Sequence, residues 1–182
     1  MKIKKIVDIC KKSHQVTILN EKEGIQWLGD GVAFYPLYDA PLFDTESLCA
    51  TFDITEKQQE NILFRQEQTP ESFCFSSECN DETYAERCDI SLNYKGEHYY
   101  VFNSHNGALY VRAKYLSPLN QEGLEIYLRQ ASKSVPYFVC KNGFLIQALI
   151  MPSLLDSNCK EFADELDNLY QMSVKAREDK CQ

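Results

Sequence analysis

The stretch "GDGVAFYPLYDAPLFDTESL", Gly29 to Leu48, shows how this chain is built locally. Asp30-Gly31 is a two-residue signal for a tight hairpin turn, because both residues tolerate the positive φ that such turns need. Strand-like runs flank it, "IQWL" before and "VAFYPLY" after, and Pro41-Leu42 ends the second strand. A helix is expected from about Asp44 and Thr45. The unit is therefore strand, turn, strand, proline and helix.

The same order recurs at two places farther along the chain. One is "HNGALYVRAKYLSPLNQEGL", His105 to Leu124, and a fainter one is "KNGFLIQALIMPSLL", Lys141 to Leu155. Two origins stay open: a duplication, or convergence, since any hairpin that leads into a helix tends to carry Gly at the turn and Pro at the exit. Either origin predicts an α+β fold with a mainly antiparallel sheet, built from two or three strand-turn-strand-helix units.

Amphipathic patterns predict a helix at each end of the chain. In the N-terminal one, Ile3, Ile6, Val7 and Cys10 lie on one side and lysines cover the other. After Pro152 an apolar stripe with an acidic outer face predicts a long C-terminal helix, with Leu155, Cys159, Phe162, Leu166, Leu169 and Tyr170 in the stripe.

Two shorter segments are also predicted to be helical. One is "TEKQQENILF", which begins with a capping-box pattern at Thr55 to Gln58. The other follows Pro118 and runs from about Gln121 to Gln130.

Four segments follow from this pattern. We expect a first strand and helix unit over residues 1–66, an acidic, loop-rich connection over 67–88, a second unit over 89–176, which a duplication would explain, and a flexible tail over 177–182. The hydrophobic content of 44% and the aromatic fraction of 12% suffice for one compact globular domain.

The charge distribution limits the classes of molecule that the protein is expected to bind. A formal net charge of −8 disfavours general attraction to nucleic acid or to anionic lipid. Residues 1–14 are the exception, with five lysines against Asp8. The start of the chain has no long apolar run, and the run from Phe144 to Met151 is too short to span a bilayer. We therefore expect a cytoplasmic protein without membrane contact, whose eight cysteines are free thiols.

No motif for catalysis, a cofactor or a metal stands out. Cys74, Cys79 and Cys88 have no His between them and do not form two close pairs, so we expect no zinc site, although the spacing alone leaves metal binding by these three open. Neither G-x-S-x-G nor a glycine-rich phosphate loop is present, and His98 and His105 lie beside predicted turns. We predict a non-enzymatic protein, and an enzyme with a cysteine or carboxylate centre is a third hypothesis.

The whole chain resembles small proteins encoded by prophages and mobile elements of gut Firmicutes. The blocks that carry the resemblance are "MKIKKIVDICKKS", "QWLGDGVAFYPLYDAPLFDTESLCATFDI", "AKYLSPL" and "PYFVCKNGFLIQALIMP". It implies a bacterial mobile element as the source and transfers no catalytic residue.

A local resemblance bears on mechanism. "GDGVAFYPLYDAPLFD" is similar to the hairpin of bacterial DNA sliding clamps. That similarity implies a clamp-like processivity factor or DNA-binding accessory factor, with Lys4, Lys5, Lys11 and Lys12 as phosphate contacts. Clamps place their helices along a basic inner channel, so overall acidity does not exclude DNA there.

Our leading hypothesis is an accessory or adaptor protein that acts through protein–protein contacts. The partner would be an unknown protein or a second copy of the chain, and DNA would be a partner only in the clamp-like alternative. Aromatic residues cluster on the predicted strands, and by strand alternation half of them would be partly exposed. We expect an exposed interaction surface from Trp27, Tyr35, Tyr38, Tyr99 and Tyr110.

Overall fold

The computed structural model describes residues 2–22, 24–104, 107–131 and 135–153, together with 168, 170–172 and 175. The N-terminal helix is confirmed as α1, Ile3–Ser13, whose apolar side is buried. Basic residues in its last turn favour the helix because they face the negative end of its dipole. The helix ends at His14, which adopts a left-handed conformation with φ 56°.

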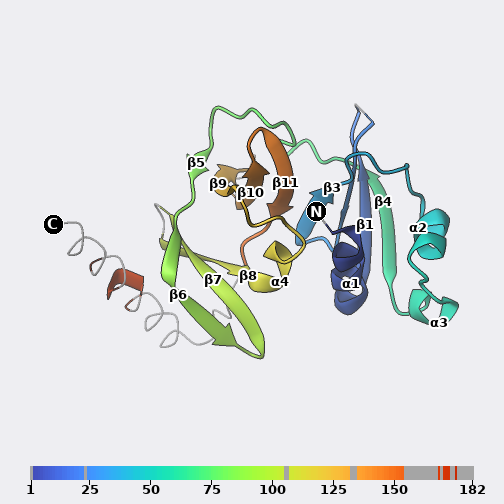
Figure 1. Ribbon diagram of the computed structural model, residues 1–182, viewed down its shortest axis with the longest axis horizontal. Coiled ribbons are helices and arrows are strands. Elements are labelled where there is room, and N and C mark those ends of the chain that lie inside the picture. The colour runs from blue at the N-terminus through green and yellow to red at the C-terminus, as the bar shows by residue number, and fades with distance from the viewer. Residues whose placement is uncertain are drawn as a thin grey trace.

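An eight-stranded mixed sheet forms the centre of the protein (Figure 1), in the order β4-β1-β2-β3-β11-β10-β9-β5. In chain order its strands are β1 Gln15–Asn20, β2 Gln26–Gly29, β3 Ala33–Pro36, β4 Leu63–Gln68, β5 Thr83–Tyr84, β9 Leu124–Gln130, β10 Pro136–Asn142 and β11 Leu145–Ile150. A separate antiparallel sheet contains β6 Arg87–Tyr94, β7 Glu97–Ser104 and β8 Gly107–Arg112. The short helices are α2 Thr45–Thr51, α3 Glu56–Gln59 and α4 Ala113–Leu116.

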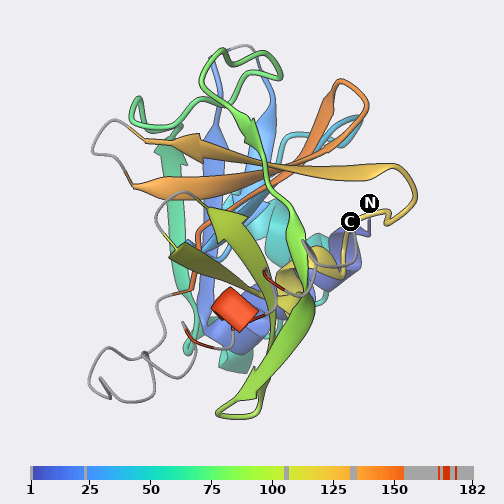
Figure 2. The same cartoon turned by 90° about the vertical axis from the view of Figure 1, so that its left-hand side faces the viewer.

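The two faces of the large sheet are covered differently. On one face, here called the helix side, the core cluster joins residues of α1, α2, α4 and the three-stranded sheet, and Phe102 of β7 packs 4.9 Å from Phe138 of β10, centroid to centroid. On the other face, the loop side, Trp27, Tyr137, Val139 and Leu149 form a second cluster. In Figure 2 the yellow-green three-stranded sheet, α4 and α1 lie below the orange strands β9 and β10.

The large sheet has an approximate internal symmetry. A helix followed by a three-stranded meander occurs twice, as α1-β1-β2-β3 and as α4-β9-β10-β11. The two meanders meet where β3 pairs antiparallel with β11, through Phe34 with Leu149 and Ala33 with Ile150. The first and the faintest of the three similar sequence stretches therefore lie in equivalent hairpins of this sheet, whereas the second stretch contributes β8 to the three-stranded sheet.

The predicted fold class is wrong. The large sheet is mixed, because β4 pairs parallel with β1. The repeated unit of the large sheet is also different, because a helix precedes each of its two three-stranded meanders. The long C-terminal helix was predicted over residues that lie mostly outside those described, and its stripe residue Tyr170 is buried against Val101.

The predicted helix from Gln121 to Gln130 is instead strand β9, and the reason is its period. Leu124, Ile126 and Leu128 alternate with polar or amphipathic residues and pack on the helix-side core. A period of two suits a strand, and tertiary pairing on both sides of β9 completes it.

The other local predictions have mixed outcomes. α2 begins at the predicted place, where the side chain of Asp44 accepts from the Ser47 N–H at 2.8 Å. The capping box at Thr55 forms, but α3 lasts only four residues before the chain turns into β4. Gly31 and Gly143 have positive φ at the turns of β2-β3 and β10-β11, as predicted.

Candidate functional site

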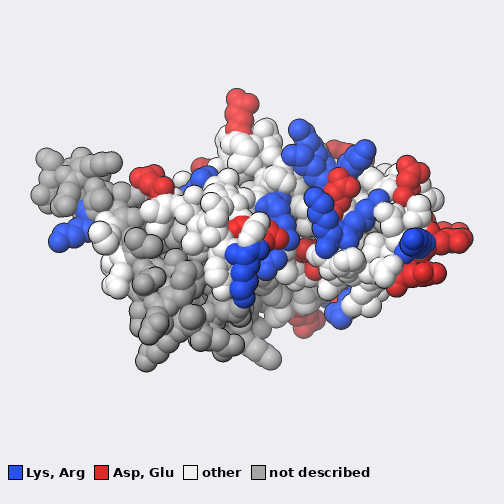
Figure 3. Space-filling view, turned by 90° about the horizontal axis from the view of Figure 1, so that it is seen from below, with Lys and Arg blue, Asp and Glu red and all other residues white. Residues whose placement is uncertain are grey.

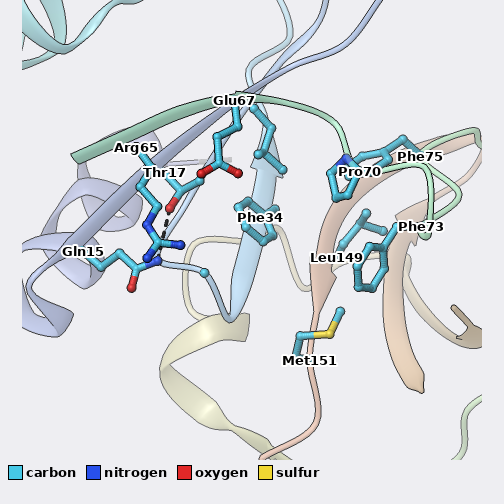
Figure 4. Close-up of a pocket in the computed structure, with 12 residues that line it drawn as sticks. Gln15, Thr17, Phe34, Arg65, Glu67, Pro70, Phe73, Phe75, Leu149 and Met151 are labelled. Atoms are coloured by element: carbon cyan, nitrogen blue, oxygen red, sulfur yellow. Dashed lines mark hydrogen bonds between the residues drawn. The ribbon is translucent and has the colours of Figure 1, made fainter. Parts of the chain in front are cut away.

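A groove of about 280 Å³ lies on the loop side of the large sheet, at the end where β4 is the edge strand. We call it the sheet-face groove (Figure 4). It is lined by Gln15, Thr17, Leu19, Gly31, Phe34, Arg65, Glu67, Pro70, Phe73, Phe75, Leu149 and Met151. One end is apolar and the other, toward β1 and β4, is polar.

Strand alternation explains how distant residues share this groove. Gln15, Thr17 and Leu19 are every second residue of β1, so their side chains point to the same face. The parallel register places Thr17 beside Arg65 and Leu19 beside Glu67 of β4. On the other flank, β11 contributes Leu149 and the residue after its end, Met151.

The loop after β4 forms the apolar wall of the groove. Phe73 stacks edge-on against Tyr137 of β10 with ring centroids 5.0 Å apart, and Phe75 meets Trp27 of β2 at the same distance. Aromatic contacts of this kind add to the burial energy of each ring. Both phenylalanines are half-buried, so each one packs on the sheet and still faces the groove.

Two buried cations hold this loop in place. Arg129 of β9, only 1% exposed, donates to the carbonyl oxygens of Cys74, Ser76 and Ser77 at 3.0, 2.8 and 3.2 Å. Lys141 of β10 donates to the Ser77 carbonyl at 2.8 Å. Each loop carbonyl is thereby satisfied by a charged donor, and such bonds are stronger than neutral ones.

Glu82 neutralises part of this positive charge. Its Oε2 accepts from Arg129 Nε and Nη2 at 2.9 and 2.6 Å, and its Oε1 accepts from Lys141 Nζ at 2.5 Å. Burial alone would raise the pKa of Glu82, but the hydrogen bonds and charges of Lys141 and Arg129 outweigh it and lower that pKa. The three side chains form what we call the Glu82 clamp, which fixes the wall of the groove.

The polar end of the groove is organised by the β2-β3 turn. Asp30 accepts from the N–H groups of Val32 and Ala33 at 3.0 and 3.1 Å and from the Tyr115 hydroxyl at 3.0 Å. Gly31 has φ +86°, and a Cβ there would approach Gln15 Nε2 to 2.5 Å. Gln15 itself donates to Thr17 Oγ1 at 3.3 Å. The buried Asp30 carboxylate is therefore structural, since turn and tyrosine donors occupy it.

The segment that runs from β4 through the wall loop is acidic, and the groove itself is lined by Arg65 and Glu67. Residues 65–82 contain five acidic side chains and one arginine. Glu82 is committed to its clamp, whereas the other four, Glu67, Glu71, Glu78 and Asp81, are exposed. The electrostatic field at this side of the sheet therefore favours positively charged groups.

The predicted aromatic interaction surface is largely buried. Trp27 is 1% exposed, Tyr35 1% and Tyr99 4%, while Tyr38 and Tyr110 are half-buried. Side chains do alternate between the two faces of the large sheet, but both faces are covered. The rings of Trp27 on β2 and Tyr35 on β3 are therefore buried in the two core clusters. The apolar residues of the groove, Phe34, Phe73 and Phe75 among them, were not predicted as a site.

The predicted lysine face is only partly available. Lys4, Lys5 and Lys12 are exposed on α1, and Lys11 is half-buried with its Nζ donating to the Phe52 carbonyl at 3.0 Å. Lys5 Nζ also donates to the Ser117 carbonyl at 3.1 Å, next to α4. Figure 3 shows Lys and Arg side chains grouped near the centre of the face seen from below and acidic side chains at its right-hand end.

The cysteines and histidines that the structure describes do not converge on one site. Cys74 and Cys79 are half-buried in the wall loop, whereas Cys88 is buried against Val101. In the described part of the chain, no group of three or more His, Cys, Asp or Glu residues is placed to hold a metal ion. His98 Nδ1 donates to Asn93 Oδ1 at 2.8 Å, and His105 lies outside the described residues.

The groove is thus a concave site that combines apolar and polar side chains, and buried contacts hold its wall loop in place. Among the described residues, every helix is too short or too polar to cross a lipid bilayer. Comparison with known proteins finds no protein-family model, no curated protein and no solved structure that matches this chain.

Proposed function

We propose that the protein is a non-enzymatic adaptor that binds a positively charged segment of a partner protein, with an apolar side chain of that segment held in the sheet-face groove. The single observation that carries the proposal is that the apolar wall of the groove is formed by a loop with exposed acidic side chains. Phe34, Phe73 and Phe75 offer contact to an apolar group, Glu67 lines the groove, and the wall loop carries the exposed Glu71.

The size of the groove favours a side chain over a cofactor. Sites for small molecules typically enclose roughly 300–1,000 Å³ and bury most of the ligand. At about 280 Å³ the groove is smaller and open on one side, which suits one or two apolar side chains of a larger partner. A buried aromatic anchor surrounded by polar contacts is the usual form of an interaction hot spot.

The wall is suited to this task because it is already ordered. The Glu82 clamp and the ring contacts of Phe73 and Phe75 hold the loop without a partner. A preformed wall lowers the ordering cost of binding.

The test uses two short probes and nuclear magnetic resonance. Acetyl-Lys-Trp-Lys-amide is titrated into ¹⁵N-labelled protein, and acetyl-Glu-Trp-Glu-amide is the charge-reversed probe. We expect shifts at the amides of Phe34, Phe73, Phe75 and Met151 with the lysine probe, weaker binding at higher salt and much weaker binding of the glutamate probe. Shifts confined to other surfaces, or equal binding of both probes, would overturn the proposal.

A matched pair of variants separates the groove from general hydrophobicity. Phe73→Ala removes part of the wall, whereas Phe144→Ala removes a side chain that is 91% exposed and lies outside the groove. Binding of the lysine probe should fall about tenfold or more in the first variant, as for loss of an interface anchor. It should be unchanged in the second.

A DNA-binding accessory function is the second candidate, and one observation favours it. α1 and α4 are joined at one end, where the Lys2 N–H donates to the Pro118 carbonyl at 3.1 Å, so two helices form one layer that carries exposed Lys4, Lys5 and Lys12. A helical layer with lysines is what the clamp-like hypothesis requires.

Salt dependence tests the second candidate. If Lys4, Lys5 and Lys12 contact phosphates, binding of a fluorescent DNA duplex should weaken with salt, and replacing all three by alanine should reduce the slope of log K against log salt by about 3. Lys22→Ala, outside α1, is the control. Absence of duplex binding at low salt, or a slope that the triple variant leaves unchanged, would exclude these lysines from such a role.

A further inference from the structure

The edge strand β4 has backbone groups and charges that are complementary to those of a second, antiparallel copy of β4. It is the outermost strand of the large sheet and pairs only with β1 among the described strands. Five of its six residues are exposed, and only Phe64 is half-buried. An exposed edge strand offers a row of backbone donors and acceptors to another chain unless something blocks it.

The hydrogen bonds of β4 show which of its backbone groups are free. The N–H of Leu63 donates to the His14 carbonyl at 2.9 Å, and that of Thr69 donates to the Asn20 carbonyl at 3.1 Å. Backbone groups of a strand alternate in direction, so those of Phe64, Gln66 and Gln68 point away from β1. No described residue donates to or accepts from these outward groups.

We propose that two copies of this protein associate through antiparallel pairing of β4 with β4, with the two-fold axis at Gln66. This register makes Gln66 pair with Gln66 and Phe64 pair with Gln68 of the second copy, and each such pair exchanges two backbone hydrogen bonds. The outward groups of all three residues are used. The large sheet then continues from one copy into the other.

The charges of Arg65 and Glu67 favour this register over the two adjacent antiparallel registers. With the axis at Gln66, Arg65 lies opposite Glu67 of the second copy, and the same ion pair recurs by symmetry. These are the non-hydrogen-bonded positions of an antiparallel pair, where side chains are closest. An axis at Arg65 or at Glu67 would place like charges opposite each other, which is destabilising.

The contact leaves the apolar end of the sheet-face groove open. Arg65 and Glu67 face the loop side, so their ion pairs would form at the polar end of the groove, whereas Phe73, Phe75 and Met151 lie toward β10 and β11. Each dimer would present two grooves on one face of a continuous sheet. Association through β4 does not require an occupant in either groove.

Sedimentation equilibrium of the full chain over a wide range of protein concentrations tests the contact. We expect a monomer–dimer equilibrium in the wild type. Arg65→Glu should weaken the dimer about tenfold or more, because two ion pairs become two like-charge pairs. The double variant Arg65→Glu, Glu67→Arg restores opposite charges across the axis and should restore dimerisation.

A backbone variant and an amide measurement locate the interface independently of charge. Gln66→Pro removes an outward N–H that the monomer does not use, and proline is tolerated on an edge strand, so the monomer should stay folded and the dimer should be lost. Hydrogen exchange of the Phe64, Gln66 and Gln68 amides should slow as the wild-type concentration rises. A wild type that is monomeric at all concentrations, or a dimer that Arg65→Glu and Gln66→Pro both leave intact, would overturn the proposal.

Discussion

Arg129 and Glu82 form an ion pair in which two nitrogens of one guanidinium, Nε and Nη2, donate to the same carboxylate oxygen at 2.9 and 2.6 Å. The other carboxylate oxygen is bound by Lys141. Because Arg129 is 1% exposed, neither its charge nor its donors have access to water, and the fold depends on Glu82 to compensate them.

Glu82→Gln should therefore destabilise the protein. Removing one partner from a buried ion pair leaves two poorly compensated cations, and the expected loss is about 3 kcal/mol in the free energy of unfolding. Chemical denaturation monitored by circular dichroism measures it. Glu78→Gln, an exposed acidic residue of the same loop, is the control and should change stability little. Equal effects of the two variants would show that the clamp does not stabilise the fold.

The lowered pKa of Glu82 predicts that the stability of the protein depends on pH. The pKa of Glu82 is lowered below its ordinary value of 4.5, so the folded state binds this proton less readily than the unfolded state. The stabilisation is fully present above pH 4.5 and is lost as the pH falls through the lower pKa of the folded protein. Unfolding measured across this acidic range should show a steeper loss for the wild type than for Glu82→Gln. Parallel pH profiles would contradict it.

Tyr115→Phe should destabilise the junction between α4 and the β2-β3 turn. The Tyr115 hydroxyl donates to the buried Asp30 carboxylate at 3.0 Å, and burial together with the Asp30 charge raises the pKa of Tyr115. Loss of this donor leaves a buried carboxylate oxygen without its partner, at a cost of about 1–3 kcal/mol. Thermal or chemical unfolding gives the value. Tyr84→Phe, at a tyrosine 66% exposed, should cost almost nothing.

Gly31→Ala should cost more stability than Gly96→Ala. Both glycines have positive φ, +86° and +78°, so each substitution carries a strain of about 1–2 kcal/mol. Only at Gly31 would the new Cβ also meet a side chain, Gln15, whereas nothing lies within 4 Å at Gly96. The difference between the two unfolding free energies reports on the Gln15 contact alone. No difference would mean that Gln15 moves aside freely.

The thiols should differ widely in reactivity. Cys140 is buried, and burial raises its pKa to about 12; burial raises the pKa of Cys10 as well. Neither forms appreciable thiolate near neutral pH, whereas Cys74 and Cys79 are half-buried in the wall loop. Alkylation with N-ethylmaleimide followed by peptide mass spectrometry should modify Cys74 and Cys79 before Cys10 and Cys140. Early modification of Cys140 would indicate that the sheet opens locally.

The features that could be predicted from the sequence are those that depend on residues close together in the chain. The amphipathic period of α1, the Asp44 cap of α2 and the glycines of the β2-β3 and β10-β11 turns all act within a few residues, and all form as expected. The prediction of a helix after Pro118 is wrong, because the segment instead forms β9, in which Leu124, Ile126 and Leu128 alternate with the period of a strand.

Other features depend on contacts that one-dimensional patterns do not contain. The parallel pairing of β1 with β4 joins strands separated by two other strands and two helices, so nothing near either strand signals it. The groove draws residues from positions 15 to 151. A partial signal did exist for its clamp, because Lys141 directly follows the apolar run Tyr137 to Cys140 and would need a carboxylate to be buried.

The junction of β3 with β11 has a consequence for synthesis of the chain on the ribosome. β3 is made early, but its neighbour in the sheet is among the last described strands to be made. Throughout most of translation the first meander therefore has an unpaired inner edge, including Ala33 and Phe34, that the finished protein conceals. The sheet can close only after β11 has been made. Until then we expect chaperone binding and aggregation to compete for the exposed edge of β3, and both should stop when β11 pairs with it.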